Sequence, residues 1–445
     1  MSAFTPIADA MHAEGISQAA IDAFEYSVET LTSNRSMLIA EDDILPAQGV
    51  EDWESLIATS PEADAALLAQ SVIIKLNGGL GTSMGLQKAK SLLPIKEGVN
   101  FLDVAVRQVK SLRQRANAPV SLLLMNSFST SADTMEHLGQ YAADGFADPS
   151  SVEMLQNKVP KLLIETMLPA SSPAKPDMAW CPPGHGDIYP ALLGSGWLDK
   201  LLAAGVKYAF ISNSDNLGAQ MDGRFLSWFA ASGAPFVMEV TKRTEADKKG
   251  GHLAMRKSDA QLLLREVAQC ANADIDEFQN IAKHQFFNTN SLWLRLDALK
   301  DLLAENKGIV PLPVICNSKT LDPRDADSPK VYQLETAMGA AIQCFVGSRA
   351  VCVPRSRFFP VKTCSDLLLL RSDAVEINEE GCMSLAAECG GTPPIVDLDS
   401  KLYKLVDSLD SLGVPSLKNV SKLTVRGEHH FAAGESLSGE VKIGC

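Results

Sequence analysis

The chain has 445 residues, which is more than one hydrophobic core usually holds, so two or three domains are expected. Its formal net charge of −14 disfavours nucleic acid or an anionic membrane as the main partner, although local lysines can still bind a small anionic substrate. The hydrophobic fraction of 46% is ordinary for a globular protein, and no apolar run is long enough to span a bilayer.

Residues 1–45 are expected to form a peripheral helical segment, because apolar residues fall on one helical face at Ile21, Phe24, Val28 and Leu31. The first 15 residues carry acids and lack the basic start and apolar run that are typical of a secretory signal. The nine cysteines include no C-x-x-C pair, and their spacing with histidines is not typical of zinc. Reduced thiols in a cytoplasm are therefore expected.

The run Ile73–Gly85 changes from an apolar strand pattern to four glycines, and Lys88 and Lys90 follow it. Glycine lets the backbone turn sharply and present N–H groups, so a phosphate-binding loop between a strand and a helix is predicted. The helix is indicated by apolar residues at helical spacing from Leu102 to Leu112. No Walker tripeptide occurs, and the glycine spacing is one residue too long for a dinucleotide fingerprint. An ordinary glycine-rich turn is the alternative.

Strand-like runs then alternate with helical patterns, which favours a parallel, doubly wound sheet. The expected strands are 72–76, 121–125, 208–212, 236–240 and 292–296. Ligands of such sheets bind outside the carboxyl ends of the strands. Polar residues gather at those ends, at Asn77–Gly79, Asn126, Asn213–Asn216 and Glu239. These clusters predict one shared site.

Three further segments carry candidate chemistry. The loop Trp180–Asp187 holds two prolines and two glycines; His185 can donate to a phosphate or sugar there or be structural, and Asp187 is expected to cap the next helix. The run Arg355–Lys362 is basic, and a solvated surface run is one interpretation; the apolar residues within it argue against full exposure and favour Lys362 pointing inward to an anion. The Phe287–Asn290 amides, placed before a strand at 291–296, bind sugar hydroxyls or form a simple turn.

Asp215 lies at the end of an apolar run in the sequence Ile-Ser-Asn-Ser-Asp-Asn. A carboxylate at this place suits a hard divalent ion that shares its other positions with water and phosphate oxygens. A turn rich in Asn and Asp is the alternative. The glycine-rich loop earlier in the chain favours the metal interpretation.

The last 25 residues contain two interleaved six-residue repeats, one apolar and one of small residues: Val425, Phe431, Leu437 and Ile443, with Gly427, Ala433, Gly439 and Cys445. This pattern predicts a short parallel β-helix, with a hairpin as the alternative. A single coil cannot bury its own apolar face, so we expect it to pack on the preceding α/β domain or on another subunit.

Motifs along most of the chain resemble the eukaryotic-type UTP–glucose-1-phosphate uridylyltransferases, the UDP-glucose pyrophosphorylases. The segments that carry this resemblance are Lys75–Gly85, Gln156–Pro160, Pro182–Asp187, Ile211–Gly218, Met238–Val240, Lys249–Gly251, Phe287–Trp293, Gln333–Thr336 and Val353–Leu367. The resemblance implies an α/β fold with a Rossmann-like, doubly wound mixed sheet in a GT-A-like nucleotidyltransferase core. It also implies an N-terminal helical segment at 1–45, a catalytic domain at 46–375 and a C-terminal domain at 376–445 that ends in a left-handed parallel β-helix.

The same resemblance implies a site. Nucleotide-binding residues would be Leu76, Asn77, Gly78, Gly79, Lys90, Gln156, Gly184, Asn213, Ser214, Asp215 and Lys362, and substrate-binding residues would be His185, Glu239, Gly251, Asn288 and Asn290. Among these, Lys90 and Lys362 would be the catalytic cations, and Asp215 would hold Mg²⁺. The implied reaction converts glucose 1-phosphate and UTP to UDP-glucose and pyrophosphate, in the cytoplasm, without a protein nucleophile.

Two departures from the family pattern are visible. Lys88-Ala89 stands where the family commonly has Gly-Pro before Lys90, and the β-helix ends sooner than in many relatives, which leaves homo-oligomer formation through it open. The alternatives are a broader UDP-sugar pyrophosphorylase that also uses galactose 1-phosphate, an NAD-dependent oxidoreductase, and a non-catalytic β-helix assembly subunit. Retention of Lys90, Lys362 and Asp215 argues against the last.

Overall fold

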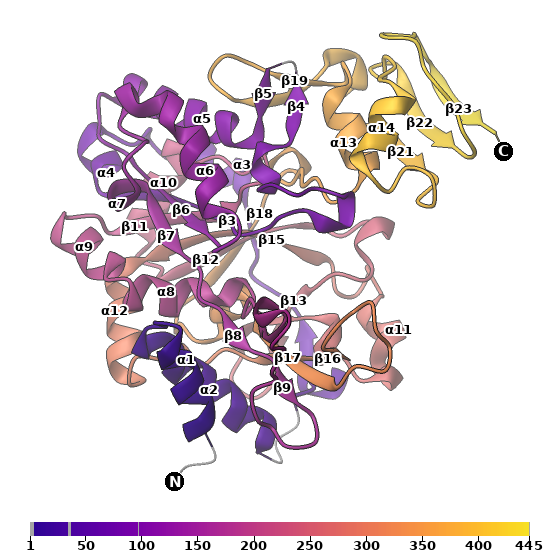
Figure 1. Ribbon diagram of the computed structural model, residues 1–445. Helices are drawn as coiled ribbons and strands as arrows, with labels where there is room; N and C mark the ends of the chain where they lie inside the picture. Colours follow the sequence, from indigo (N-terminus) through magenta and orange to yellow (C-terminus); the bar gives the residue numbers. More distant parts are fainter. Residues whose placement is uncertain (1–3, 34–36, 97, 445) are drawn as a thin grey trace. The chain divides into compact units, whose positions relative to one another are not determined.

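The computed structural model describes residues 4–33, 37–96 and 98–444 of the chain (Figure 1). The chain forms two compact units, each built from three segments. Unit 1 comprises Met1–Ile74, Glu153–Ile211 and Asp222–Pro354, and unit 2 comprises Lys75–Val152, Ser212–Met221 and Arg355–Cys445. The three domains expected from the family resemblance stay a prediction.

Unit 1 contains a mixed sheet. Its strands neighbour one another in the order β2 (Glu51–Asp52), β18 (Arg349–Cys352), β12 (Phe236–Lys242), β15 (Phe286–Arg295) and β11 (Tyr208–Asn213). β12, β18 and β2 pair in parallel, whereas β15 is antiparallel to both of its neighbours. The parallel sheet that the alternation of patterns favoured is therefore wrong at β15, whereas the mixed sheet implied by the family resemblance is confirmed. After β12 the chain forms the hairpin of β13 (His252–Arg256) and β14 (Leu262–Arg265) instead of a crossover helix, so it re-enters the sheet in the opposite direction.

The N-terminal helices α1 (Thr5–Ala13) and α2 (Gln18–Thr32) form as expected, and both lie in unit 1. Helix α2 begins at Ser17, whose hydroxyl accepts the N–H of Ala20. The predicted apolar face of α2 is buried in a cluster with β8 (Val159–Pro160), β16 (Val314–Thr320) and β17 (Lys330–Thr336) (Figure 1). The helices therefore serve packing, as the pattern indicated.

Unit 2 contains the carboxyl end of β3 (Ser71–Asn77), its sheet neighbour β6 (Ser121–Asn126) and helix α5 (Phe101–Ala116). A capping box between Asn100 and Asp103 starts α5. The prediction that the glycine-rich segment runs directly into this helix is wrong. Two short 3₁₀ turns and the hairpin of β4 (Pro94–Lys96) and β5 (Val99–Asn100) lie between them. The glycine-rich segment therefore does not have the dipole of α5 directly behind it.

The C-terminal part of unit 2 packs α13 (Cys364–Arg371) and α14 (Val406–Leu412) against β21 (Ile395–Leu398), β22 (Val420–Val425) and β23 (Gly439–Ile443) (Figure 1). The three strands pair in parallel, and Val425 lies opposite Ile443. A hairpin would pair β22 and β23 antiparallel, so the hairpin alternative is excluded.

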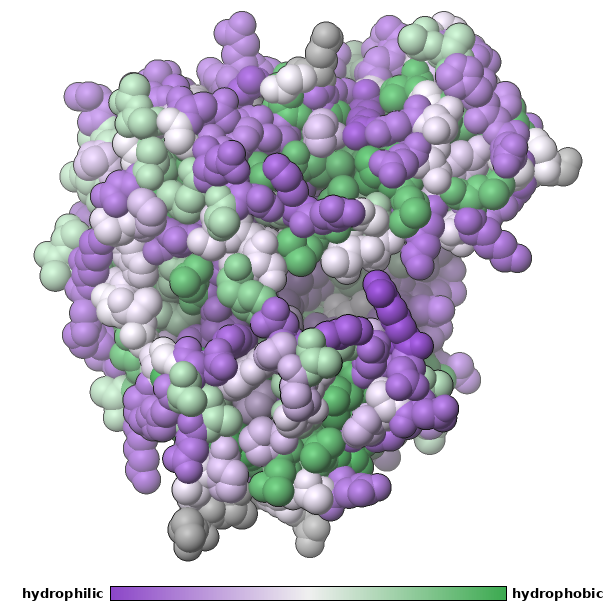
Figure 2. Space-filling model, viewed as in Figure 1, coloured by the Kyte–Doolittle hydropathy of each residue, from purple (hydrophilic) through white to green (hydrophobic). Residues whose placement is uncertain are grey.

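The remaining helices and strands extend the sheets or connect their elements. They are β1 (Ile44–Pro46), α3 (Trp53–Thr59), α4 (Ala65–Ala69), α6 (Ser131–Leu138), α7 (Pro149–Val152), β7 (Glu153–Leu155), β9 (Leu162–Leu163), β10 (Trp180–Cys181), α8 (Ile188–Gly194), α9 (Trp197–Ala203), α10 (Gly223–Ser232), α11 (Ile275–Phe278), α12 (Leu296–Glu305), β19 (Val375–Ile377) and β20 (Met383–Leu385). Within the described ranges, no helix has the length and apolar character needed to cross a membrane. The face in view carries hydrophilic residues with smaller hydrophobic areas between them (Figure 2).

Candidate functional site

The residues of unit 2 that were predicted to bind phosphates come together. The N–H of Lys90 donates to the carbonyl of Gly79, 3.0 Å away, and its ammonium contacts Asp215 Oδ2 at 2.5 Å. The same ammonium donates to the carbonyl of Val361, whose own N–H donates to the carbonyl of Asp215. The glycine-rich loop, the carboxylate and the chain just before Lys362 are thus joined by hydrogen bonds.

Lys362 itself is exposed, and its backbone N–H donates to Asp366 Oδ2 at 2.9 Å. The prediction that the Lys362 side chain points inward is therefore wrong. The apolar residues of the run account for the difference, since Phe358 and Val361 are buried while the lysine between Val361 and α13 is not. Pairing of Asn216 with Pro360 fixes this run beside the Asp215 loop.

The start of the glycine-rich loop is fixed by hydrogen bonds to side chains of α6, of the turn before α6 and of the end of β6. Asn77 is 2% exposed, and its amide donates to Asn126 Oδ1 at 2.7 Å and to Thr134 Oγ1 at 3.0 Å. Thr130 and Ser127 donate their hydroxyls to the carbonyls of Asn77 and Gly78. With these groups engaged, the backbone N–H groups of the loop are the ones that suit phosphate oxygens.

The Asn213–Ser214 segment is fastened to β3. The N–H of Ser214 donates to the carbonyl of Leu76 at 3.1 Å. One residue before Leu76, the buried Lys75 ammonium donates to Ser212 Oγ at 2.9 Å and to the Ala219 carbonyl at 2.8 Å. Sequence reasoning gave Lys75 no role, although a charged residue inside an apolar strand was a visible signal.

In unit 1, the two residues predicted to read a uracil are in contact. Gln156 donates its Nε2 to the carbonyl of Gly184 at 3.0 Å. Gly184 has a positive φ of +80°, and a Cβ there would lie 2.4 Å from the carbonyl oxygen of Thr336. Only glycine fits both the backbone angle and this close approach.

His185 follows in a 3₁₀ turn and is oriented by the backbone of Met338. The Met338 N–H donates to His185 Nδ1 at 3.0 Å, and Tyr189 donates its hydroxyl to the Met338 carbonyl at 2.7 Å. Burial lowers the pKa of His185 to about 4, so the ring is neutral near pH 7. With Nδ1 accepting, the proton of the neutral ring is on Nε2, which makes that atom a hydrogen-bond donor.

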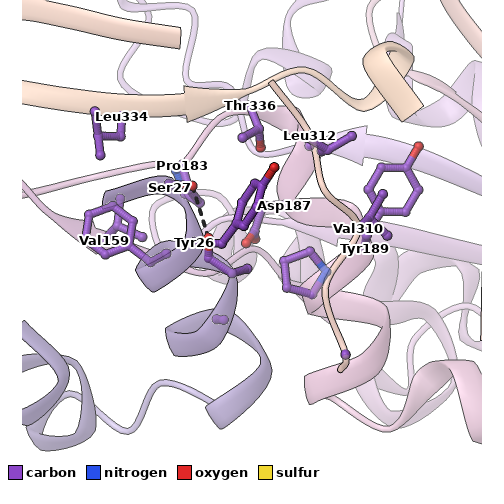
Figure 3. A pocket seen from close by; sticks show the side chains of 16 residues that line it. Tyr26, Ser27, Val159, Pro183, Asp187, Tyr189, Val310, Leu312, Leu334 and Thr336 are labelled. Carbon is purple, nitrogen blue, oxygen red and sulfur yellow. Dashed lines mark hydrogen bonds between the residues drawn. The ribbon is translucent and has the colours of Figure 1, made fainter. Parts of the chain in front are cut away.

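Asp187 does not cap α8 as predicted. Its carboxylate accepts the backbone N–H of Asn157 at 2.7 Å and the Asn157 side-chain amide at 3.0 Å, and no cap bond forms. Burial raises the pKa of Asp187 to about 7, although the hydrogen bonds from Asn157 oppose that shift. Asp187 also lines a cavity of unit 1 bounded by α2, Pro183 and Leu312 (Figure 3). Sequence reasoning assigned no role to Asn157, and nothing local could have shown its partner.

A bulge in β15 brings together the residues predicted to bind a sugar. Glu239 and Val240 of β12 pair with Ser291 and Asn288, so Thr289 and Asn290 form the bulge. Glu239 is fully buried, and its Oε1 accepts the indole N–H of Trp293 at 2.8 Å. The Asn288 and Asn290 side chains and backbone bond to each other, with Asn290 at a positive φ of 56°. These amides lie within β15, so their expected place before the strand is wrong and the simple-turn alternative is excluded.

Gly251 joins this group, because its carbonyl accepts the N–H of Asn288 at 3.3 Å. A Cβ at Gly251 would lie 2.5 Å from a carboxylate oxygen of Glu266, so glycine is required there.

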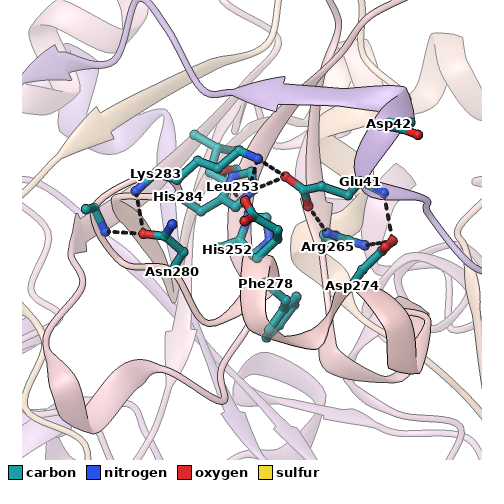
Figure 4. Close-up of polar contacts among 12 residues, drawn as sticks. Glu41, Asp42, His252, Leu253, Arg265, Asp274, Phe278, Asn280, Lys283 and His284 are labelled. Atoms are coloured by element: carbon teal, nitrogen blue, oxygen red, sulfur yellow. Dashed lines mark hydrogen bonds and ion pairs between the residues drawn. The ribbon is translucent and has the colours of Figure 1, made fainter.

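The adjacent His252 stacks on His284, which is hydrogen-bonded to Glu41 in a network with Arg265 (Figure 4). Burial opposes ionisation of Glu41, but bonds from Lys283, His284 and Arg265 prevail and lower its pKa to about 2.

The side chains of this site suit a metal ion only if phosphates and water supply most of the oxygens that coordinate it. Among the described residues, no group of three or more His, Cys, Asp or Glu side chains could hold an ion. Asp215 supplies one carboxylate, and it already accepts a cation in the form of the Lys90 ammonium. This arrangement fits Mg²⁺, which commonly takes one or two carboxylates together with phosphates and waters.

A mixed α/β fold in which a glycine-rich loop, the Lys90 ammonium and the Asp215 carboxylate meet at the strand ends is typical of a nucleotidyltransferase. The sequence matches the family UTP–glucose-1-phosphate uridylyltransferase over residues 21–438, and the chain belongs to that family. It is 41% identical over 393 residues to the UTP–glucose-1-phosphate uridylyltransferase of Saccharomyces cerevisiae, covering 88% of this chain and 77% of that protein.

Solved structures agree with this assignment. A mutant of UDP-glucose pyrophosphorylase from Leishmania major in complex with UDP-glucose is 45% identical, with a TM-score of 0.93 and coverage of 99% of this chain and 94% of that one. A UDP-glucose phosphorylase structure from Trypanosoma brucei is 46% identical, with a TM-score of 0.90 and coverage of 99% and 95%.

Proposed function

We propose that this chain transfers the uridylyl group of UTP to glucose 1-phosphate, giving UDP-glucose and pyrophosphate. A phosphate oxygen of the sugar attacks the α-phosphorus in line, the bond to the pyrophosphate breaks, and the reaction is reversible. The observation that carries this proposal is the hydrogen-bonded group of Gly79, Lys90, Asp215 and Val361 in a chain of this family. Its chemistry is that of polyanion alignment and charge neutralisation, which phosphoryl transfer requires.

Lys90 and Lys362 act as the catalytic cations in this proposal. Lys90 is fixed beside Asp215 and stabilises the departing pyrophosphate. Lys362 is exposed at the N-terminal side of α13, and we propose that its ammonium turns toward the phosphates once the nucleotide is bound. Neither lysine exchanges a proton with the substrates, since both act through their charge.

Asp215 would hold Mg²⁺, which would neutralise phosphate charge when bound. The Lys90 ammonium beside the same carboxylate supports this role, because it marks Asp215 as a cation-binding side chain. Leu76, Asn77, Gly78, Asn213 and Ser214 bind the nucleotide through the loops that surround this carboxylate, and we expect the backbone groups to make most of the contacts.

Unit 1 supplies the groups that select the base and the sugar. Gln156 and Gly184 read the uracil edge, a role that their mutual hydrogen bond supports. His185 donates a hydrogen bond from Nε2 to the sugar phosphate. The ring is neutral near pH 7, so it binds the phosphate as a hydrogen-bond donor and not as a cation. The oxygens and amides of Glu239, Gly251, Asn288 and Asn290 match the alternating donors and acceptors of sugar hydroxyls.

The C-terminal strands are proposed to begin a left-handed β-helix. Three six-residue repeats separate Val425 from Ile443, and these residues are parallel neighbours, as in one β-helix coil. A homo-oligomer could form through β23, because β23 is the last strand of its three-stranded sheet. The free thiols among the described cysteines support a cytoplasmic location.

Pyrophosphate release from UTP and glucose 1-phosphate tests the function directly. Release that requires both substrates is the expected result. Equal turnover with galactose 1-phosphate would instead indicate a broader UDP-sugar pyrophosphorylase. Tight NAD binding without UTP binding would point to an oxidoreductase, and binding of neither would leave only an assembly role.

A further inference from the structure

Lys75 is a charged residue inside a buried strand. It is 4% exposed, and the residues before it in β3, Val72 to Ile74, are apolar and buried. Lysine is almost never fully buried unless its ammonium is satisfied, because removing the charge from water is costly. Its position therefore calls for a role that an apolar residue could not fill.

The contacts of the Lys75 ammonium enclose the Asp215 loop. Ser212 Oγ, 2.9 Å away, lies just before Asn213, and the Ala219 carbonyl, 2.8 Å away, lies just after Gly218. One side chain thus fastens both ends of the segment that carries Asp215. A third bond, from the Ser214 N–H to the Leu76 carbonyl, ties the same segment to the next residue of β3.

Lys75 also brings a positively charged side chain into the strand that leads to the glycine-rich loop. A full positive charge becomes favourable when an anion lies nearby, since charges interact strongly in a low-dielectric interior. Leu76 to Gly79, which follow Lys75 directly, form the start of the proposed phosphate-binding loop.

We propose that Lys75 is a positioning residue for nucleotide transfer, which fixes the Asp215 loop from both ends and adds a buried positive charge that favours the phosphates of the nucleotide. This inference rests on the proposed function. It assigns Lys75 no contact with the reacting atoms. Its effect on binding should therefore grow with the number of phosphates on the ligand, because the added term is electrostatic.

The test compares Lys75→Met with Lys96→Met. Lys96 is a control in the same unit, because its half-buried side chain also donates to two backbone carbonyls, those of Arg371 (3.2 Å) and Ser372 (2.5 Å), away from the Asp215 loop. Affinities for UTP, UDP, UMP and uridine are measured by calorimetry. For Lys75→Met we expect UTP affinity to fall roughly 10- to 100-fold, UDP and UMP progressively less, and uridine little. Lys96→Met should leave all four unchanged.

Equal weakening of all four ligands, or no weakening, would overturn the proposal. Should Lys75→Met fail to fold, Lys75→Arg and Ser212→Ala replace it. In Lys75→Arg, affinity should still depend on the number of phosphates on the ligand. Ser212→Ala keeps the Lys75 charge but loosens the Asp215 loop. It should therefore lower kcat and leave the ratio of UTP affinity to UMP affinity unchanged. A shift of that ratio in Ser212→Ala would contradict the assignment of charge to Lys75. Failure of the unmodified chain to release pyrophosphate would refute the proposed function instead.

Discussion

Replacing Asp187 with asparagine should change how the stability of this protein depends on pH. Asp187 is 3% exposed, and burial raises its pKa from 3.8 to about 7. Between these two values the unfolded chain has lost the proton while the folded chain retains it. The folded state then binds more protons, so the contribution of Asp187 is most favourable below about pH 4 and is lost as pH rises through 7.

The size of this effect follows from the shift. A difference of about three pKa units corresponds to roughly 4 kcal/mol at 1.36 kcal/mol per unit, as an upper bound before structural relaxation. Asp187→Asn removes the titration but also one of the oxygens that accept from Asn157. Relative to the unmodified chain, the variant should therefore be less stable at pH 4 and gain several kcal/mol by pH 8.

Urea unfolding of both proteins at half-unit steps from pH 4 to 8 measures the difference in the free energy of unfolding. A difference that stays constant with pH would refute the reasoning, since it would mean that Asp187 titrates alike in both states. Asn157→Ala is the companion variant. It removes the side-chain amide donor that favours the ionised form and keeps the backbone N–H, so the pH window in which stability is lost should move upward. The same variant should weaken UTP binding, because Asn157 adjoins Gln156.

Four further predictions concern the site. Gly184→Ala should weaken UTP binding at least tenfold, because its Cβ would lie 2.4 Å from a carbonyl oxygen, and an unchanged affinity in titrations would show that the turn is not used. Glu239→Gln keeps an acceptor for the Trp293 indole, so the fold should survive while the KM for glucose 1-phosphate rises about tenfold; an equal rise in the KM for UTP would contradict its place in the sugar pocket. Chelation of divalent cations should abolish turnover, and Asp215→Asn should raise the Mg²⁺ concentration for half-maximal rate; the same requirement in both proteins would place the ion elsewhere. Because His185 has a pKa of about 4, His185→Gln should lower kcat without removing an inflection near pH 6.5 from the rate profile, and loss of such an inflection would show a protonated ring.

Local patterns in the sequence predicted the strands and the residues at their ends. β3, β6, β11 and β12 lie where apolar runs indicated them, because strands buried on both faces need continuous apolar residues. Polar and glycine residues directly after such runs can only lie at strand ends. The placement of Gly79 and Asp215 at the ends of neighbouring strands was therefore foreseeable before any coordinate was known.

Partners that lie far apart in the chain could not be foreseen. Asp187 binds Asn157 instead of capping α8, since two donors from a neighbouring segment outcompete the free N–H groups of the helix. The direction of β15 depended on the hairpin that precedes it, and its bulge at Thr289–Asn290 depended on pairing with β12. A single-residue pattern contains neither strand direction nor pairing register.

By itself, then, the order of residues determined which short segments bear chemistry and placed the chain in its family, because backbone freedom, charge and apolar periodicity are local properties. The fold alone decided which donors face which acceptors: that Lys90 meets Asp215, that Lys75 fastens the loop beyond β11, and that Lys362 stays in solvent. Hydrogen-bond partners and protonation depend on burial and on distances across the chain, and those exist only once the chain has packed.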